Sequence, residues 1–163
     1  IPRTPEGTRP DETHPFFSDA EPLAHYSRFA KIYAAWAFYR KELVREAVAN
    51  GLPVVRHPFI HYPEDPKVYG ISYQQFMVGS EFMMAPVLDP GRDTVAAYLP
   101  AGKWVHLWSG ETYDAPDSGL TVTVDAPLGQ PGVFYREGSP VAARFITNLR
   151  EADILARGAV ESS

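Results

Sequence analysis

The chain has 163 residues, a formal net charge of −5, 45% hydrophobic residues and no cysteine. This length predicts one domain, or one domain and a smaller piece, and the apolar content suffices for a buried core, which excludes disordered and fibrous classes. The mildly acidic balance argues against a nucleic-acid partner, and the lack of cysteine excludes a disulfide framework, a zinc finger and thiol catalysis.

Residues 1–17 contain four prolines and show neither helical nor strand periodicity. They are typical of a strand end that runs into a loop, and nothing in them could fold alone. The chain begins with Ile1 rather than Met, and no charged and then apolar leader precedes the first regular segment. We therefore expect a chain that was processed or that belongs to a longer polypeptide.

Residues 20–50 carry two adjoining apolar rows at the three- and four-residue spacing of an α-helix. Ser18 with Glu21 predicts a capping box at the start, and Asn50 with Gly51 predicts a left-handed stop. One long helix and two helices with a break near Ala37 both fit this pattern. The first row is Leu23, Tyr26, Ala30, Tyr33 and Ala37, and the second is Phe29, Ile32, Trp36, Tyr39, Leu43 and Ala47.

From Gly51 the apolar period changes to two, and turn residues recur at short intervals, which predicts an antiparallel sandwich of short strands. The strand at residues 82–88 is apolar on both faces and is therefore expected to be central. At residues 103–108 the alternation places Trp104, His106 and Trp108 on one side. Residues 141–155 return to helical spacing. The expected strands are residues 54–60, 82–88, 94–99, 103–108, 120–125 and 133–136.

The predicted fold class is therefore α+β, with a helical segment first and an antiparallel β-sandwich second. We place the boundaries at residues 1–51, 52–140 and 141–163, the last being a short helical tail. The longest apolar run, residues 32–39, is far shorter than the roughly 20 residues of a membrane helix, so we expect a soluble protein, with the cytoplasm as the favoured compartment. A helix that is apolar on two sides lacks partners in so small a β module, and we infer that these partners lie upstream of Ile1.

Pairs of carboxylates are the first candidates for catalysis, because glycosidic hydrolysis needs two at a defined separation. Every such pair lies beside proline, glycine or serine in an expected turn, where Asp supports backbone hydrogen bonds, so we favour a structural role. Glu6 alone, between Pro5 and Gly7, has the setting of a site residue. The pairs are Asp11 with Glu12, Glu64 with Asp65, Asp89 with Asp93, and Asp114 with Asp117.

Signatures of metal, cofactor and nucleophile chemistry are weak or missing in the sequence. His57 and His61 could share a face, but prolines interrupt the run and no carboxylate completes a ligand set, so no metal site is predicted. The sequence has no phosphate loop and no nucleophile elbow, and no cofactor is expected. Trp104, Trp108 and Tyr113 could stack on sugar rings, although a place in the core or at an interface is the favoured interpretation.

Several strings of the chain resemble the C-terminal part of glycoside hydrolase family 31, in its bacterial branch of α-glucosidases and sulfoquinovosidases. Residues 3–10 resemble the Arg-Thr-His-Glu-Gly segment that ends the last barrel strand, and residues 23–41 resemble the helix after it. Residues 98–104 fit the Leu-Pro-x-Gly-x-Trp pattern of the family. The other similar strings are residues 51–59, 62–66, 79–88, 108–113 and 127–139.

The resemblance implies that residues 1–51 are the last strand, loop and helix of a (β/α)₈ barrel, followed by a C-terminal sandwich. It implies a retaining α-glycosidase that hydrolyses terminal α-glucosides or sulfoquinovosides with an Asp nucleophile and an Asp acid/base. Both Asp residues are expected upstream, so no catalytic residue is assigned to this chain, and the carbohydrate and the upstream barrel are the expected partners. Arg3 and Glu6 are the candidate substrate-binding residues. The alternative is a stand-alone carbohydrate-binding or structural β-sandwich module without catalysis.

Pro5 stands where the family has a histidine that hydrogen-bonds the sugar, and proline offers no side-chain donor or acceptor and no backbone N–H. We predict that Pro5→His in the complete enzyme lowers KM or raises kcat for an α-glycoside, because it restores that hydrogen bond. Steady-state kinetics of the two proteins test this prediction. Unchanged constants would mean that this loop does not contact the sugar.

Overall fold

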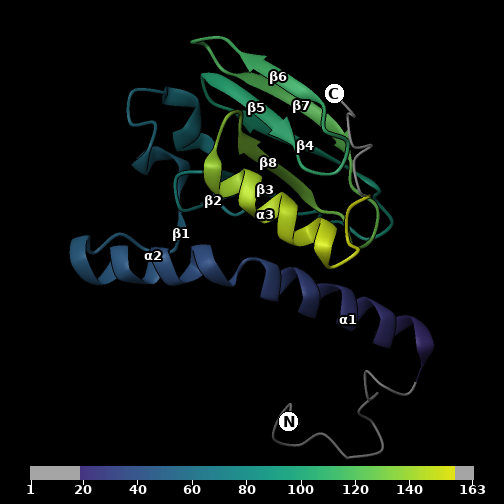
Figure 1. Ribbon diagram of the computed structural model, residues 1–163. Helices are drawn as coiled ribbons and strands as arrows, with labels where there is room; N and C mark the ends of the chain where they lie inside the picture. Colours follow the sequence, from purple (N-terminus) through teal and green to yellow (C-terminus); the bar gives the residue numbers. More distant parts are fainter. Residues whose placement is uncertain (1–18, 157–163) are drawn as a thin grey trace, which may run out of the picture.

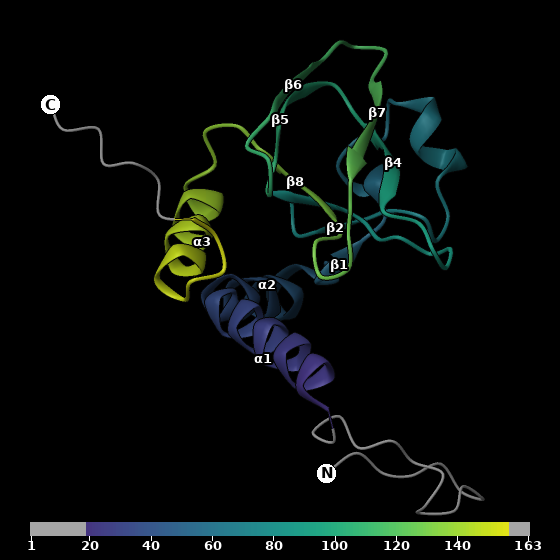
Figure 2. The same ribbon diagram turned by 90° about the vertical axis from the view of Figure 1, so that its right-hand side faces the viewer.

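The computed structural model describes residues 19–156, which form three layers (Figure 1). Three helices cover one face of a six-stranded sheet, and a two-stranded sheet covers the other face (Figure 2). None of the helices in this part of the chain is long and apolar enough to cross a membrane. The helices are α1 (Ala20–Ala35), α2 (Ala37–Asn50) and α3 (Pro140–Glu151).

Eight short strands build the two sheets, and two 3-10 helices interrupt the chain after the first strand. The 3-10 helices are η2 (Pro58–Ile60) and η3 (Pro66–Gly70). The strands are β1 (Val55–Arg56), β2 (Phe76–Val78), β3 (Phe82–Ala85), β4 (Thr94–Leu99), β5 (Gly102–His106), β6 (Thr112–Ala115), β7 (Leu120–Asp125) and β8 (Gly132–Arg136).

The six-stranded sheet has the order β1-β2-β3-β8-β5-β6, and every neighbouring pair in it is antiparallel. β4 pairs with β7 over its whole length and lies across the sandwich core from the larger sheet. The predicted antiparallel sandwich is confirmed, and β3 lies inside its sheet, as its two apolar faces indicate. β8 is also central, because it pairs with both β3 and β5.

Alternating residues of the strands build the core between the two sheets. In β7, Val122 and Val124 are buried while the threonines beside them are exposed, as the period of two predicts. Trp104 fills the middle of this core, and its indole N–H donates to the carbonyl of Pro100 at 2.9 Å. The one polar group of this large side chain is thereby satisfied away from water.

A second core lies between the helices and the opposite face of the six-stranded sheet. Phe145 of α3 connects the helices to the sheet in this core. The centroid of its ring lies 4.7 Å from that of Trp36 and 5.7 Å from that of Phe82. The ring of Tyr39 in α2 lies 5.7 Å from the same Phe82 ring. The helix predicted near the end of the chain is present, and α3 is part of this core rather than a peripheral tail. Its buried residues are Ala142, Phe145 and Leu149.

The helical segment is divided into two helices with the break at Trp36, which confirms the alternative of a break near Ala37. Trp36 still donates its N–H to the carbonyl of Ile32, so α2 continues in nearly the line of α1 (Figure 1). Gly51 ends α2 with a φ of 72°, which confirms the predicted left-handed stop. At the other end the N-cap residue is Asp19, whereas Ser18 of the predicted capping box lies outside the described residues.

The prediction of a strand at residues 54–60 is wrong beyond Arg56, where the strand ends. Pro58 has no N–H to give to a sheet, and Nδ1 of His57 accepts a hydrogen bond from the N–H of Phe59 at 3.2 Å, which begins η2 instead. The sequence pattern also missed β2 and β6. These strands have three and four residues, and runs so short contain too few alternations to show a period.

α2 is held to the sheet at two points. At the first, Gly79 has a φ of 58°, and a Cβ at this position would collide with the hydroxyl and ring of Tyr39. At the second, the buried guanidinium of Arg56 forms an ion pair with Glu46 of α2, and its Nη1 lies 3.2 Å from Nε2 of His61. Because Arg56 is always protonated, Nε2 of His61 accepts this hydrogen bond and the ring is neutral.

Burial lowers the pKa of His61, and the charges of Arg56 and Arg136 lower it further against the opposing effect of Glu46 and Glu81. The unfolded chain therefore takes up a proton near its ordinary pKa of about 6.5, while the folded chain does not, so stability is lost as the pH falls below that value. We predict that the free energy of unfolding, measured with urea, decreases between about pH 7.5 and about pH 5.5 by up to about 1.4 kcal/mol per pH unit.

The matched variant for this experiment is His61→Gln, which keeps an acceptor for Arg56 but cannot titrate. Its free energy of unfolding should depend less steeply on pH than that of the unmodified chain over the same interval. If the two slopes are equal, the pH dependence does not come from His61.

Candidate functional site

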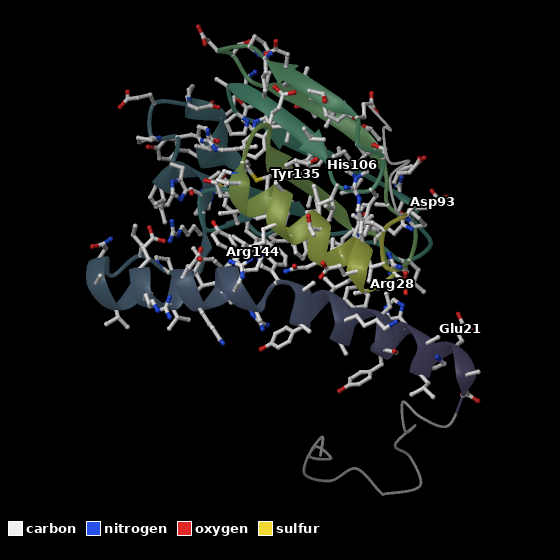
Figure 3. The ribbon with its side chains drawn as sticks, in the orientation of Figure 1. Glu21, Arg28, Asp93, His106, Tyr135 and Arg144 are labelled. Carbon is white, nitrogen blue, oxygen red and sulfur yellow. The ribbon has the colours of Figure 1, made fainter. Side chains whose placement is uncertain are left out.

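The residues implied to bind substrate, Arg3 and Glu6, lie outside the described residues, as does Pro5. α1 is the described element that follows them in the chain, and its first turns extend beyond the sandwich, where Glu21 marks the free end (Figures 1 and 3). α1 is thus the connection between the sandwich and the segment that carries these candidates.

The three aromatic residues considered as a sugar platform do not share a surface. Trp104 is 1% exposed, inside the sandwich core. Trp108 lies past the end of β5, packs against the helix-side core, and donates its indole N–H to the carbonyl of Pro131 at 2.6 Å. Tyr113 is half-buried and donates its hydroxyl to Glu111 at 2.8 Å. The prediction of a sugar platform is therefore wrong for these residues. The prediction that Trp108 shares a face with Trp104 is also wrong, because the strand ends before Trp108.

Asp65, His57 and His61 form structural hydrogen bonds in the described chain. Asp65 accepts the N–H of Lys67 at 3.0 Å to begin η3 and accepts the hydroxyl of Tyr98 at 2.6 Å, which is the structural role expected of it. His57 and His61 have separate partners, since Nε2 of His57 lies 2.6 Å from the carbonyl of Ile71. Within residues 19–156, no group of three such side chains could hold a metal ion.

The outer face of α1 and α2 carries an apolar stripe that residues 19–156 do not cover. The spacing of its residues keeps them on one face of the helical segment, over a length of about 38 Å at the rise of an α-helix. Its five large side chains are between 45% and 85% exposed. An exposed apolar patch of this extent marks a contact surface. This outer stripe consists of Leu23, Tyr26, Ala30, Tyr33, Val44 and Val48.

The described chain itself buries the other apolar row of the same segment, which we call the inner row. Ile32, Trp36, Tyr39 and Leu43 pack against the sheet and α3, and the last two are 4% and 3% exposed. α3 adds a contact from its own side, where the guanidinium of Arg144 lies 4.2 Å from the ring centroid of Phe38 (Figure 3). The inner row therefore packs against the sandwich and α3, whereas the described residues leave the outer stripe exposed.

The break between the helices adds polar groups to this surface. The guanidinium carbon of Arg40 lies 3.2 Å from the ring centroid of Tyr33, which is 68% exposed. Within residues 19–156, Nη1 of Arg40 is buried without an acceptor. Since a buried donor without a partner costs about 1–3 kcal/mol, this junction favours a partner that brings acceptors as well as apolar side chains.

The shifted pKa values belong to groups that hold the fold together. Burial raises the pKa of Tyr62 to about 12, and its hydroxyl accepts a hydrogen bond from Nη2 of Arg136 at 2.7 Å. Burial lowers the pKa of His106, whose Nδ1 lies 2.9 Å from the hydroxyl of Ser109. These pKa shifts therefore follow from the packing of the described chain.

Comparison with known proteins shows which family the chain resembles. Residues 51–141 match the family model of the glycosyl hydrolase family 31 C-terminal domain. The sulfoquinovosidase of Escherichia coli (strain K12) is 42% identical over 143 residues, which are 88% of this chain and 20% of that protein. The sulfoquinovosidase of Agrobacterium fabrum is 42% identical over 138 residues, which are 84% of this chain and 20% of that protein.

Comparison with solved structures leads to the same family. A family 31 sulfoquinovosidase from E. rectale, solved with an aza-sugar inhibitor, matches with a TM-score of 0.81 and 37% identity over 91% of this chain and 22% of that one. The chain spans about a fifth of the length of the curated relatives that it matches. It belongs to glycoside hydrolase family 31 and contains the C-terminal domain of that family.

Proposed function

We propose that this chain is the C-terminal part of a retaining α-glycosidase in which the outer stripe packs against a catalytic (β/α)₈ barrel. α1 and α2 are then the helix that follows the last barrel strand, so residues 1–51 belong to the barrel and residues 52–140 form a sandwich that braces it. α3, within residues 141–163, lies between these two parts. The observation that carries the proposal is the outer stripe, whose five large apolar side chains are between 45% and 85% exposed in the described residues.

The barrel supplies the chemistry in this proposal. An Asp nucleophile and an Asp acid/base about 5–5.5 Å apart form and then hydrolyse a glycosyl-enzyme intermediate, with retention of the anomeric configuration. Arg3 and Glu6 line or buttress the pocket, because the loop before the last barrel helix lies at the carboxyl ends of the strands, where active sites of such barrels form. The sandwich acts by holding the helix behind that loop.

α-Sulfoquinovosides are the favoured substrates, and α-glucosides are the alternative. The two curated relatives and the solved structure compared above are all named sulfoquinovosidases, and their similarity covers nearly the whole chain. The two sugars differ at C6, which carries a sulfonate in one and a hydroxyl in the other. The residues that distinguish these groups belong to the barrel in this proposal.

We predict that the enzyme formed by this chain and its barrel hydrolyses 4-nitrophenyl α-sulfoquinovoside with a kcat/KM about 10²-fold above that for 4-nitrophenyl α-glucoside. A pocket built to pair with a charged group rejects an analogue that lacks it by at least this much. Release of 4-nitrophenol measures the rates, and NMR spectroscopy should detect the α-anomer as the first free sugar. A preference for the glucoside would support the alternative substrate, and no release from either compound would contradict the proposed function.

We predict that Val44→Asp lowers the melting temperature of the same enzyme by several degrees, because a carboxylate pressed against the barrel loses its hydration without gaining a partner. In the 163-residue chain alone Val44 is 54% exposed, so the same substitution should change its free energy of unfolding by less than about 0.5 kcal/mol. The isolated chain should self-associate through the outer stripe, and Val44→Asp should shift it toward monomer in sedimentation velocity.

Thr121→Asp is the control, since this residue lies on the exposed face of β7, in the layer farthest from the helices. It should leave both the melting temperature and the sedimentation profile unchanged. Equal melting temperatures for the two variants, or an unmodified isolated chain that sediments as a clean monomer, would show that the outer stripe is not a docking surface.

A further inference from the structure

The helical segment is positively charged around its break, although the chain as a whole has a net charge of −5. Residues 28–45 contain five arginines and lysines and one acidic residue, Glu42. Arg28 is used inside the chain, because its Nε donates to the carbonyl of Gly129. None of the other four forms an ion pair within residues 19–156. These four cations are Lys31, Arg40, Lys41 and Arg45.

The four cations border the outer stripe on both sides. With 3.6 residues per turn, Arg40 lies along the edge next to the inner row, and the other three lie along the opposite edge. Arg40 is half-buried, whereas Lys31, Lys41 and Arg45 are exposed. An apolar centre with a polar rim is the usual anatomy of a protein interface. A partner that covers the outer stripe therefore meets positive charge at both of its edges.

Arg40 makes the strongest demand on such a partner. Its guanidinium lies against the ring of Tyr33, a member of the outer stripe, and its buried Nη1 has no acceptor within residues 19–156. An arginine cannot lose its charge by deprotonation, and a charge that is buried without a partner costs much free energy. A carboxylate removes this cost best, because its two oxygens match the planar fork of the guanidinium.

We propose that the barrel presents an acidic surface to the cations around the outer stripe and pairs one of its carboxylates with Arg40. This inference rests on the proposed function and adds the chemistry of the partner.

A second copy of this chain fits the same surface less well. In a two-fold dimer through the outer stripe the same patch lies on both sides, so each copy would bring the same four cations. Like charges would then face each other, and Arg40 would remain without an anion. Such a contact can form in the isolated chain, where the barrel is missing, but it does not satisfy the charges. The curated relatives are about five times as long as the part that this chain matches, so proteins of this family contain further chain that can supply the carboxylates.

Arg40→Lys in the complete enzyme, treated with a carbodiimide, tests this proposal directly. The reagent condenses a lysine amine with a carboxylate in contact with it, and mass spectrometry of the resulting amide identifies both residues. We expect a crosslink from position 40 to an Asp or Glu of the barrel. A mixture of isotope-labelled and unlabelled enzyme shows whether the two joined residues belong to one copy.

Arg40→Met is the second variant, because it keeps an unbranched side chain and removes the charge. It should lower the melting temperature of the complete enzyme by about 3 °C or more, since a carboxylate of the barrel then stays buried without its partner. Its kcat/KM well below that temperature should be unchanged.

Lys103→Met is the matched control, because the ammonium of Lys103 in β5 lies 3.9 Å from a carboxylate oxygen of Glu137 and both side chains are exposed. Exposed pairs contribute little, so this variant should shift the melting temperature by less than about 1 °C. A crosslink to a second copy only, or no crosslink in an active enzyme, would overturn this inference and leave the proposed function intact. So would equal melting temperatures for Arg40→Met and Lys103→Met. An unmodified enzyme that hydrolyses neither 4-nitrophenyl glycoside would contradict both proposals.

Discussion

A helix with apolar side chains on two faces cannot bury both of them against one neighbour. In residues 20–50 this constraint is met on one side only, because the inner row packs on the six-stranded sheet and α3 while the outer stripe stays open. Tyr39 and Leu43 are almost fully buried on the inner side, and each contributes about 1.5–3 kcal/mol of burial free energy. The orientation of the segment is therefore fixed by the sandwich, and the sandwich in turn determines which face is presented to a partner.

The six-stranded sheet is the middle layer, and it must be apolar on both faces. In β3 the side chain of Phe82 belongs to the helix-side core, and that of Met83 belongs to the core between the sheets. In β8 Val133 and Phe134 divide in the same way. Since protein interiors are close-packed, a displacement of the helices would be felt in both cores. This coupling explains how the sandwich holds the helical segment in a fixed orientation.

The sequence predicted the large features because they depend on period and composition. The two apolar rows of residues 20–50, the stop at Gly51 and the alternation of β7 were all visible, since each spans several repeats of its pattern. β2 and β6 were missed because three or four residues hold too few repeats. Trp108 was misplaced because alternation shows the phase of a strand but not its end.

The candidate site could be predicted only in part from the sequence. The two rows indicated that a partner is missing, but not which row the chain covers, because that depends on where α3 and the sheet lie in space. The contact of α1 with the loop between β7 and β8 was not predicted at all. It is formed by residues about one hundred positions apart, such as Arg28 and Gly129, and their hydrogen bond leaves no mark in local periodicity.

The two helices of the segment are held to the sandwich by different contacts. α2 is fastened by the close approach of Tyr39 to Gly79 and by the ion pair of Glu46 with buried Arg56. In α1 the guanidinium carbon of Arg28 lies 5.4 Å from the ring centroid of Trp108, and Nε of Arg28 donates to the carbonyl of Gly129. In the proposed enzyme the sandwich would thus anchor α2, while the barrel would hold the start of α1 and the active-site loop before it.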